Sequence, residues 1–248
     1  MIIVKGQTIR TQSKHPIIGT LTESSLHVSI KALYSLPGDR SEEPVENFII
    51  DIIRADRLIE IQIGNFSSLR PKLERLLNNH IIQILHPIPV IKWIIRQGDQ
   101  GAIISKRKSH KRGKAIDIFN ELIYIPQFLS HPNLVFELLL TEQTEILRND
   151  GKGSWRRKGW SIADRGLLSI LNTELIENID DMVAFIPQEM RTPFTNKDLA
   201  RALNCKYSLA QKMTYVLRKT GRLMITGKSG NSNLYDYSPE DSNNQNHS

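Results

Sequence analysis

Two carboxylates and a glutamine in a short apolar hairpin form the pattern in this sequence that most clearly suggests chemistry. The apolar runs 48–53 and 58–63 are separated by only four residues, a spacing that predicts a tight antiparallel hairpin. A turn centred within those four residues places Asp51 opposite Glu60, and strand alternation places Gln62 on the same face. Because like charges directly across a strand pair repel, this pairing predicts a compensating cation. Carboxylate and amide oxygens suit Mg²⁺ or Mn²⁺.

A third carboxylate, Glu23, is expected near the same place. It precedes Ile30 by seven residues and so lies on the same stripe of a predicted helix over residues 23–34. If that helix packs on the hairpin, Glu23 approaches the other carboxylates from the first helical turn. Such a cluster suits metal-assisted hydrolysis of a phosphodiester, because the ion polarises the phosphate and lowers the pKa of the attacking water.

The same residues also fit a purely structural interpretation. Glu60 and Gln62 would then line the solvent face of an edge strand, and Asp51 would pair with a nearby cation such as Arg54 or Lys72. A slip of one residue in the hairpin register removes the opposition of the carboxylates altogether.

Other elements follow from periodicity and turn residues. A second helix is expected after residues 64–68, followed by a buried strand at 81–85. Residues 115–147 and 166–187 are expected to be mostly helical, with a linker at 149–159 between them. The end of the chain predicts two short helices and a small hairpin, at residues 196–203, 208–220 and 223–237.

Positive charge favours a polyanionic partner. The chain has 33 Lys and Arg against 26 Asp and Glu, a net charge of +7. The residues between 201 and 228 include seven basic side chains and no acidic one, and residues 148–165 mix arginines with tryptophans. The run at 106–114 is basic throughout, so its cations are candidate DNA contacts: Lys106, Arg107, Lys108, Lys111 and Arg112.

Residues 20–95 resemble the PD-(D/E)xK nuclease superfamily, which includes restriction endonucleases and Holliday-junction resolvases. The resemblance rests on the order helix, hairpin, helix and strand, with Asp51 and then Glu60-Ile61-Gln62 in the hairpin. It implies that Asp51 and Glu60 bind a metal ion, assisted by Glu23. Gln62 stands where the family usually has a lysine, and glutamine cannot act as an acid or base near neutral pH. Many such nucleases are dimers, so the resemblance also implies a homodimer.

Residues 166–237 look like a winged helix-turn-helix. In that family the third helix usually enters the major groove and the wing touches the DNA backbone. Winged helices also serve as protein–protein modules, which is the alternative for this region. The matching contact positions are Lys206, Ser208, Gln211, Lys212 and Tyr215 on the helix and Lys228, Ser229 and Asn231 on the wing.

Together these patterns predict an α/β restriction-endonuclease-like domain at residues 1–147 and a mostly α winged-helix domain at 148–238. A disordered tail is expected at 239–248. The expected function is Mg²⁺- or Mn²⁺-dependent cleavage of DNA, and the alternative is an inactive DNA-binding regulator or assembly factor. No apolar run approaches the roughly 20 residues of a membrane helix, and no signal peptide is visible, so a soluble cytoplasmic protein is expected.

Overall fold

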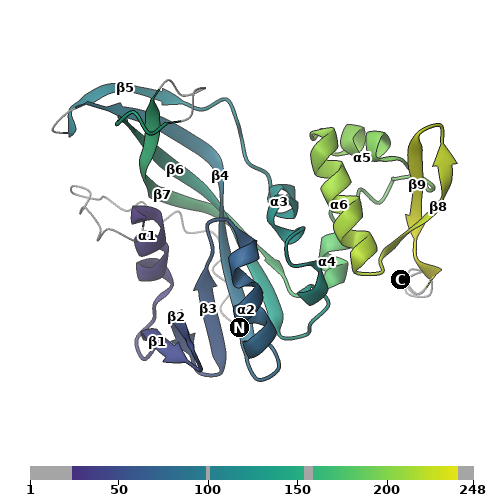
Figure 1. Ribbon diagram of the computed structural model, residues 1–248, viewed down its shortest axis with the longest axis horizontal. Coiled ribbons are helices and arrows are strands. Elements are labelled where there is room, and N and C mark those ends of the chain that lie inside the picture. The colour runs from purple at the N-terminus through teal and green to yellow at the C-terminus, as the bar shows by residue number, and fades with distance from the viewer. Residues whose placement is uncertain (1–23, 99–100, 154–158, 240–248) are drawn as a thin grey trace. The chain divides into compact units, whose positions relative to one another are not determined.

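The computed structural model describes residues 24–98, 101–153 and 159–239 (Figure 1). Its helices are α1 (Ser25–Tyr34), α2 (Arg70–Leu76), α3 (Phe119–Leu122), α4 (Ile179–Val183), α5 (Asn196–Ala202) and α6 (Tyr207–Lys219), with 3₁₀ turns at Phe66–Leu69, Ala115–Ile118 and Pro126–Phe128. The strands are β1 (Arg40–Val45), β2 (Phe48–Arg54), β3 (Arg57–Ile61), β4 (Ile81–Gln97), β5 (Ile103–Lys108), β6 (Leu134–Asn149), β7 (Trp160–Ile176), β8 (Leu223–Ser229) and β9 (Ser232–Tyr237).

The described chain divides into two compact units, each drawn from three stretches of sequence. The first unit takes its residues from 1–63, 85–115 and 137–174. The second takes its residues from 64–84, 116–136 and 175–248. In the described residues, seven strands form one sheet in the order β1-β2-β3-β4-β6-β7, with β5 paired to β4 alone, and β8 and β9 form a separate hairpin.

The prediction of a mostly α C-terminal domain is wrong. The sheet dominates the fold, and β7, at 17 residues, is longer than α6, which is the longest described helix at 13. Two segments predicted to be mostly helical, 115–147 and 166–187, instead contribute most of β6 and β7. A winged-helix domain is therefore not the architecture of residues 148–238.

Buried polar residues on β6 explain why its strand pattern is hard to recognise. From Leu139 to Leu147 burial alternates with a period of two, but the buried positions include Thr141, Gln143 and Glu145. Thr141 Oγ1 donates to the Ile88 carbonyl at 3.1 Å, and Gln143 Nε2 donates to Thr141 Oγ1 at 2.7 Å. Because polar side chains occupy inward positions, apolar periodicity does not report the strand.

The predicted order of helix, hairpin, helix and strand in residues 20–95 is confirmed for the described residues. The hairpin register is confirmed as well, because Ile52 pairs with Ile59 and Ile53 pairs with Leu58. Ala55 takes a positive φ of 51° in the turn, which closes the hairpin with only two residues between the strands.

The core of the first unit forms where α1 meets the sheet. Leu26 and Ile30 lie four residues apart on α1, so they share one face of the helix, and both are fully buried. They belong to a cluster with residues of β2, β3, β4 and β6: Ile52, Ile59, Ile61, Leu85 and Leu139. Ser24 caps the helix through its side chain, which accepts a hydrogen bond from the His27 N–H.

The second unit has its own aromatic and aliphatic core. Phe66 stacks on Phe136 with ring centroids 6.1 Å apart, and Phe119 meets Phe185 edge to face at 5.9 Å. The predicted helices and hairpin of residues 196–237 are present as α5, α6, β8 and β9. The buried side of α6 packs in this core with Leu209, Ala210, Met213, Thr214, Val216 and Leu217. No helix in the described stretches has the length and apolar character to cross a membrane.

Candidate functional site

Asp51 lies at the centre of a polar cluster between α1 and the β2–β3 hairpin. Its Oδ2 lies 3.2 Å from His27 Nε2 and accepts a hydrogen bond from the Ile61 N–H at 2.8 Å. Burial raises the pKa of the Asp51 carboxyl, but the hydrogen bonds from His27 and Ile61 and the charge of Lys31 together outweigh it. The net pKa of Asp51 is therefore below its usual range, and the group is an anion near neutral pH.

The hairpin brings Glu60 and Gln62 to the same part of the sheet. β2 and β3 are paired from Ile52 opposite Ile59 to the turn, and Asp51 and Glu60 are the next residues beyond this paired stretch. Glu60 is only 6% exposed, so an edge-strand position facing solvent is ruled out for it. The main chain of Gln62 is bound to β4, because its N–H donates to the Leu85 carbonyl at 2.9 Å and its carbonyl lies 2.7 Å from His86 Nδ1.

Only some of the metal ligands expected here belong to the described residues. Glu23 lies outside the described residues. Among the residues that are described, no group of three or more His, Cys, Asp or Glu side chains could hold a metal ion. Asp51 Oδ1 makes no hydrogen bond within the described part of the chain, since both of the contacts of this carboxylate are made by Oδ2. Metal binding by Asp51 and Glu60 therefore stays a prediction.

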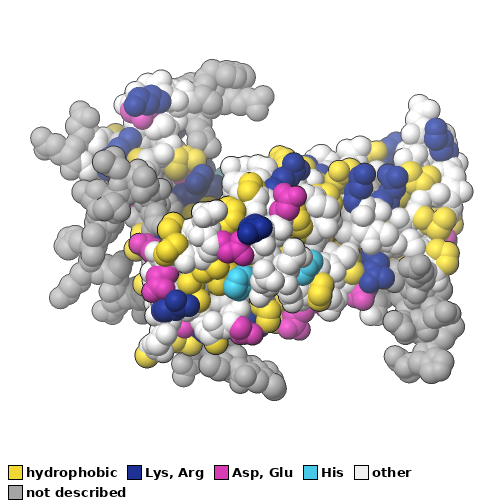
Figure 2. All heavy atoms as spheres, turned by 60° about the horizontal axis from the view of Figure 1, so that its bottom comes forward, with side chains coloured by type: hydrophobic (Ala, Val, Ile, Leu, Met, Phe, Trp, Pro, Cys, Tyr) yellow, Lys and Arg dark blue, Asp and Glu magenta, His cyan; other side chains and the backbone are white. Residues whose placement is uncertain are grey.

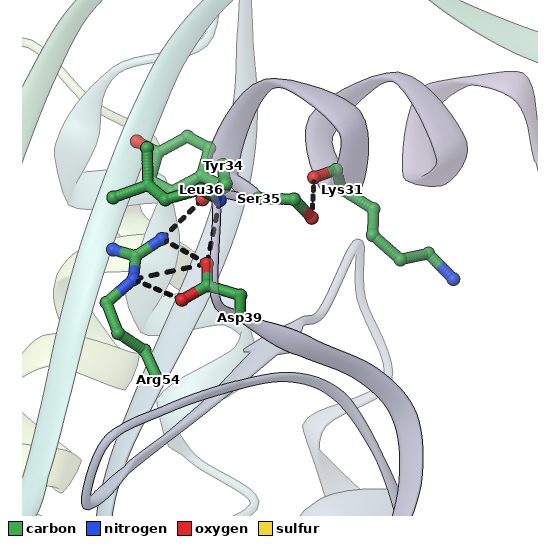
Figure 3. Close-up of polar contacts among 6 residues, drawn as sticks. All are labelled: Lys31, Tyr34, Ser35, Leu36, Asp39 and Arg54. Carbon is green, nitrogen blue, oxygen red and sulfur yellow. Dashed lines mark hydrogen bonds and ion pairs between the residues drawn. The ribbon is translucent and has the colours of Figure 1, made fainter.

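An arginine at the end of β2 is hydrogen-bonded to Asp39 and to the last turn of α1 (Figure 3). Arg54 donates to both oxygens of Asp39, from Nε to Oδ1 at 3.1 Å and from Nη2 to Oδ2 at 2.8 Å. Its Nη2 also donates to the Tyr34 carbonyl in the last turn of α1, where a cation complements the helix dipole. The Asp39 carboxylate in turn accepts the Leu36 N–H at 2.8 Å. These bonds hold the end of α1 on the hairpin, and the same helix presents His27 to Asp51.

A second set of chemistry-bearing residues lies on β5 and the loop after it, which we call the basic segment (residues 103–114). Every residue of β5 is exposed. Lys106 and Lys108 alternate onto one face of the strand, and their Nζ atoms lie 5.0 and 5.8 Å from the centre of the Trp93 ring. Arg107 lies on the other face. Lys111 and Arg112 are exposed in the loop.

Backbone contacts with β4 hold the basic segment in place. Lys106 and Lys108 belong to a strand paired to β4 in register, with Lys108 opposite Trp93. After the strand, the Gly113 N–H donates to the Pro89 carbonyl at 2.9 Å. A Cβ atom at Gly113 would lie 2.8 Å from that carbonyl oxygen, so the close approach requires glycine. The Trp93 indole N–H donates to Glu142 at 2.7 Å, which fixes the ring beneath the lysines.

The predicted contact residues on α6 and the β8–β9 hairpin belong to the second unit. Lys206 is the N-cap residue of α6 and is exposed, as are Ser208, Gln211 and Tyr215. Lys212 is half-buried, and its Nζ donates to Asn120 Oδ1 at 2.9 Å. Lys228 lies exposed on β8.

Three residues were not predicted as site residues from the sequence: His27 in the Asp51 cluster, Trp93 beneath the basic segment, and Tyr124 beside α6. In the sequence His27 follows Glu23 by four residues, the spacing of one turn in the helix expected over residues 23–34, and this spacing could have identified it. Trp93 stands in a long apolar run, and only the partner strand β5 shows that it lies under lysines. Tyr124 gives no sequence signal, because its position beside α6 depends on tertiary structure.

Cations and anions are mixed on one face of the molecule. On the face shown in Figure 2, Lys and Arg side chains lie among acidic and hydrophobic ones. The basic segment differs from such surroundings because its cations are consecutive, at Lys106, Arg107 and Lys108.

Comparison with known proteins identifies the family. A family model described as a domain of unknown function, DUF8091, matches residues 24–177. The chain belongs to the DUF8091 family. The matched region includes the Asp51 cluster and the basic segment, and it ends before α4. An uncharacterized protein of Treponema pallidum (strain Nichols) is 27% identical over 226 residues, which cover 90% of this chain and 88% of that protein. No solved structure matches the chain.

Proposed function

We propose that the protein is a cytoplasmic DNA-binding protein that contacts the phosphate backbone through the basic segment. The observation that carries the proposal is the exposed run Lys106-Arg107-Lys108 on a strand held by β4. Cations fixed at strand spacing lose less conformational freedom on binding than cations on a free loop. Phosphate contacts of this kind bind nucleic acid without reading its sequence.

Trp93 supports the lysines in this proposal rather than reading bases. Two ammonium groups lie over its ring, and its indole N–H is already bound to Glu142. The ring therefore serves to hold the cations of β5 above the sheet. The expected partner is the regular backbone of duplex DNA, and the expected specificity for base sequence is low.

The experiment compares three proteins in a fluorescence-anisotropy titration with a labelled DNA duplex at low salt. The triple variant K106A/R107A/K108A is expected to bind about tenfold more weakly or worse, because one hydrogen bond between charged groups is worth about 1.5–3 kcal/mol. Unchanged affinity in this variant would contradict the proposal.

The control keeps the net charge of the test variant. R40A/K152A/R191A also removes three exposed cations, none of them in the basic segment. It is expected to bind within about twofold of wild type, since cations outside the proposed contact add only a general attraction to DNA, which salt screens. Equal loss in both triple variants would show that net charge, and not the basic segment, determines binding.

A second candidate function, metal-dependent hydrolysis of the bound DNA, is favoured by one observation on Asp51. Its carboxylate is held ionised by His27 and the Ile61 N–H, and its Oδ1 is left without a hydrogen bond among the described residues. Asp51 and Glu60 would hold the ion, with Glu23 completing the ligand set. A Mg²⁺ ion there would supply charge to polarise a phosphate.

The test of hydrolysis is cleavage of linear, supercoiled and branched DNA with Mg²⁺ or Mn²⁺. Wild type is compared with D51A and E60A, and with K106A/R107A/K108A as a variant impaired in binding only. Cutting that is lost in D51A and E60A while DNA binding persists would support a metal nuclease. Tight binding without cutting by wild type would favour the alternative of an inactive DNA-binding regulator or assembly factor.

A further inference from the structure

The second unit carries a groove that the proposed function does not use. It lies between the exposed side of α6 and the chain after α3, and it has a volume of about 510 Å³. Small-molecule sites typically measure roughly 300–1,000 Å³. Most of the surface area that lines the groove is apolar. The lining residues, two of them tyrosines, are Ile123, Tyr124, Ser208, Gln211, Lys212 and Tyr215.

The two tyrosines present ring surface to solvent at the groove. Tyr124 and Tyr215 are each 41% exposed, which is high for aromatic side chains that line a concave site. On α6, Ser208, Gln211 and Tyr215 follow one another at helical spacing and so form one stripe. The amide of Gln211 and the hydroxyl of Ser208 make no hydrogen bond among the described residues, which leaves both available to a ligand.

Cationic side chains lie at and beside the groove. No acidic residue lines it, and the sequence contains no Asp or Glu between Asp198 and Asp236. Lys212 reaches into the lining, and Lys219 Nζ lies 6.0 Å from the centre of the Tyr215 ring. Arg70 donates to the Tyr124 carbonyl, which places another cation beside the second tyrosine.

We infer that this groove holds an unstacked base of single-stranded nucleic acid, an inference that rests on the proposed function and adds a second site to it. Tyr124 and Tyr215 supply the faces on which a base stacks. Gln211 and Ser208 offer hydrogen bonds to the edge of the base, and Lys212 offers charge to the adjoining phosphate. A duplex keeps its bases stacked and paired, so the groove favours single strands.

The experiment measures binding of a labelled twelve-nucleotide oligothymidine and of the same strand annealed to its complement, each by anisotropy at low salt. Y124A and Y215A are expected to weaken binding of the single strand by about fivefold or more, and to leave the duplex affinity within about twofold. Y215F keeps the ring and is expected to bind as wild type does. Circular dichroism confirms that each variant is folded.

Tyr207 provides a matched control on the same helix. It is 43% exposed but does not line the groove, so Y207A should bind both DNAs as wild type does. If Y124A and Y215A keep full affinity for the single strand, or lose affinity for both DNAs alike, the inference fails while the proposed function stands. If wild type binds neither DNA, both fail, and the groove belongs to an occupant of another kind.

Discussion

Replacing Arg54 tests how the candidate site is held together. R54A removes the bidentate contact with Asp39 and the hydrogen bond to the Tyr34 carbonyl. It leaves the Asp39 carboxylate without its cation, although the Asp39 side chain is only 5% exposed. Breaking a buried ion pair costs about 3–5 kcal/mol. The Arg54 side chain is 35% exposed and Asp39 keeps the Leu36 N–H, so screening and that bond reduce the expected cost to about 2–3 kcal/mol.

The assay is thermal unfolding by scanning calorimetry. A loss of about 2–3 kcal/mol corresponds to a fall of roughly 4–12 °C in Tm for a chain of this size. R54K keeps the charge but not the planar fork, so it should recover less than half of that loss. A double-mutant cycle with D39A isolates the pair and should give a coupling of at least about 1 kcal/mol. A Tm for R54A within 1 °C of wild type, or R54K indistinguishable from wild type, would show that the contacts of Arg54 do not stabilise the fold in this way.

Three further predictions concern buried polar groups of the first unit. The pKa of Asp51 is lowered in the folded protein, so the contribution of its carboxylate to stability is complete above about pH 4 and is lost as the pH falls below that value. The Tm of D51N should therefore fall less than that of wild type between pH 5 and pH 3. Parallel curves of Tm against pH for the two proteins would contradict this. Burial and the Glu137 carboxylate, whose Oε1 lies 2.7 Å from the Tyr34 hydroxyl, raise the pKa of Tyr34. Tyr34 therefore loses its proton at lower pH in the unfolded chain than in the folded protein, and stability should fall above about pH 10. The Tm of Y34F should fall less steeply than that of wild type in the same melts. T141V leaves the buried amide of Gln143 without its hydrogen-bond acceptor and should lower the free energy of unfolding in urea by about 1–3 kcal/mol. T141S keeps the hydroxyl and should lower it clearly less. Equal losses in the two variants would show that packing, and not the hydrogen bonds, determines the effect.

Local patterns account for the parts of the fold that the sequence predicts. The β2–β3 hairpin follows from two apolar runs separated by four residues, and this spacing sets its register. The helix over Ser25–Tyr34 follows from the spacing of Leu26 and Ile30, which lie one turn apart in the core. In each case the information lies within one short, continuous stretch of sequence.

The parts that could not be predicted depend on contacts between distant residues. On β6, Thr141 and Gln143 are buried because each finds a hydrogen-bond partner, and the polar inward face hides the alternation of a strand. The pairing of β5 with β4 places Trp93 under two lysines, which no local pattern indicates. For the candidate site, sequence gives Asp51 and Glu60 on adjacent strands but not the His27 contact, which joins residues 24 positions apart.

Contact between the basic segment and DNA phosphates is tested most directly by the salt dependence of DNA binding. The logarithm of the binding constant is measured against the logarithm of salt concentration for wild type and for K106A/R107A/K108A. Each phosphate contact contributes about −0.9 to the slope. If the basic segment contacts phosphates as proposed, the variant's slope should be shallower than that of wild type by about 2 to 3. An identical slope in the two proteins would show that the basic segment does not contact DNA phosphates.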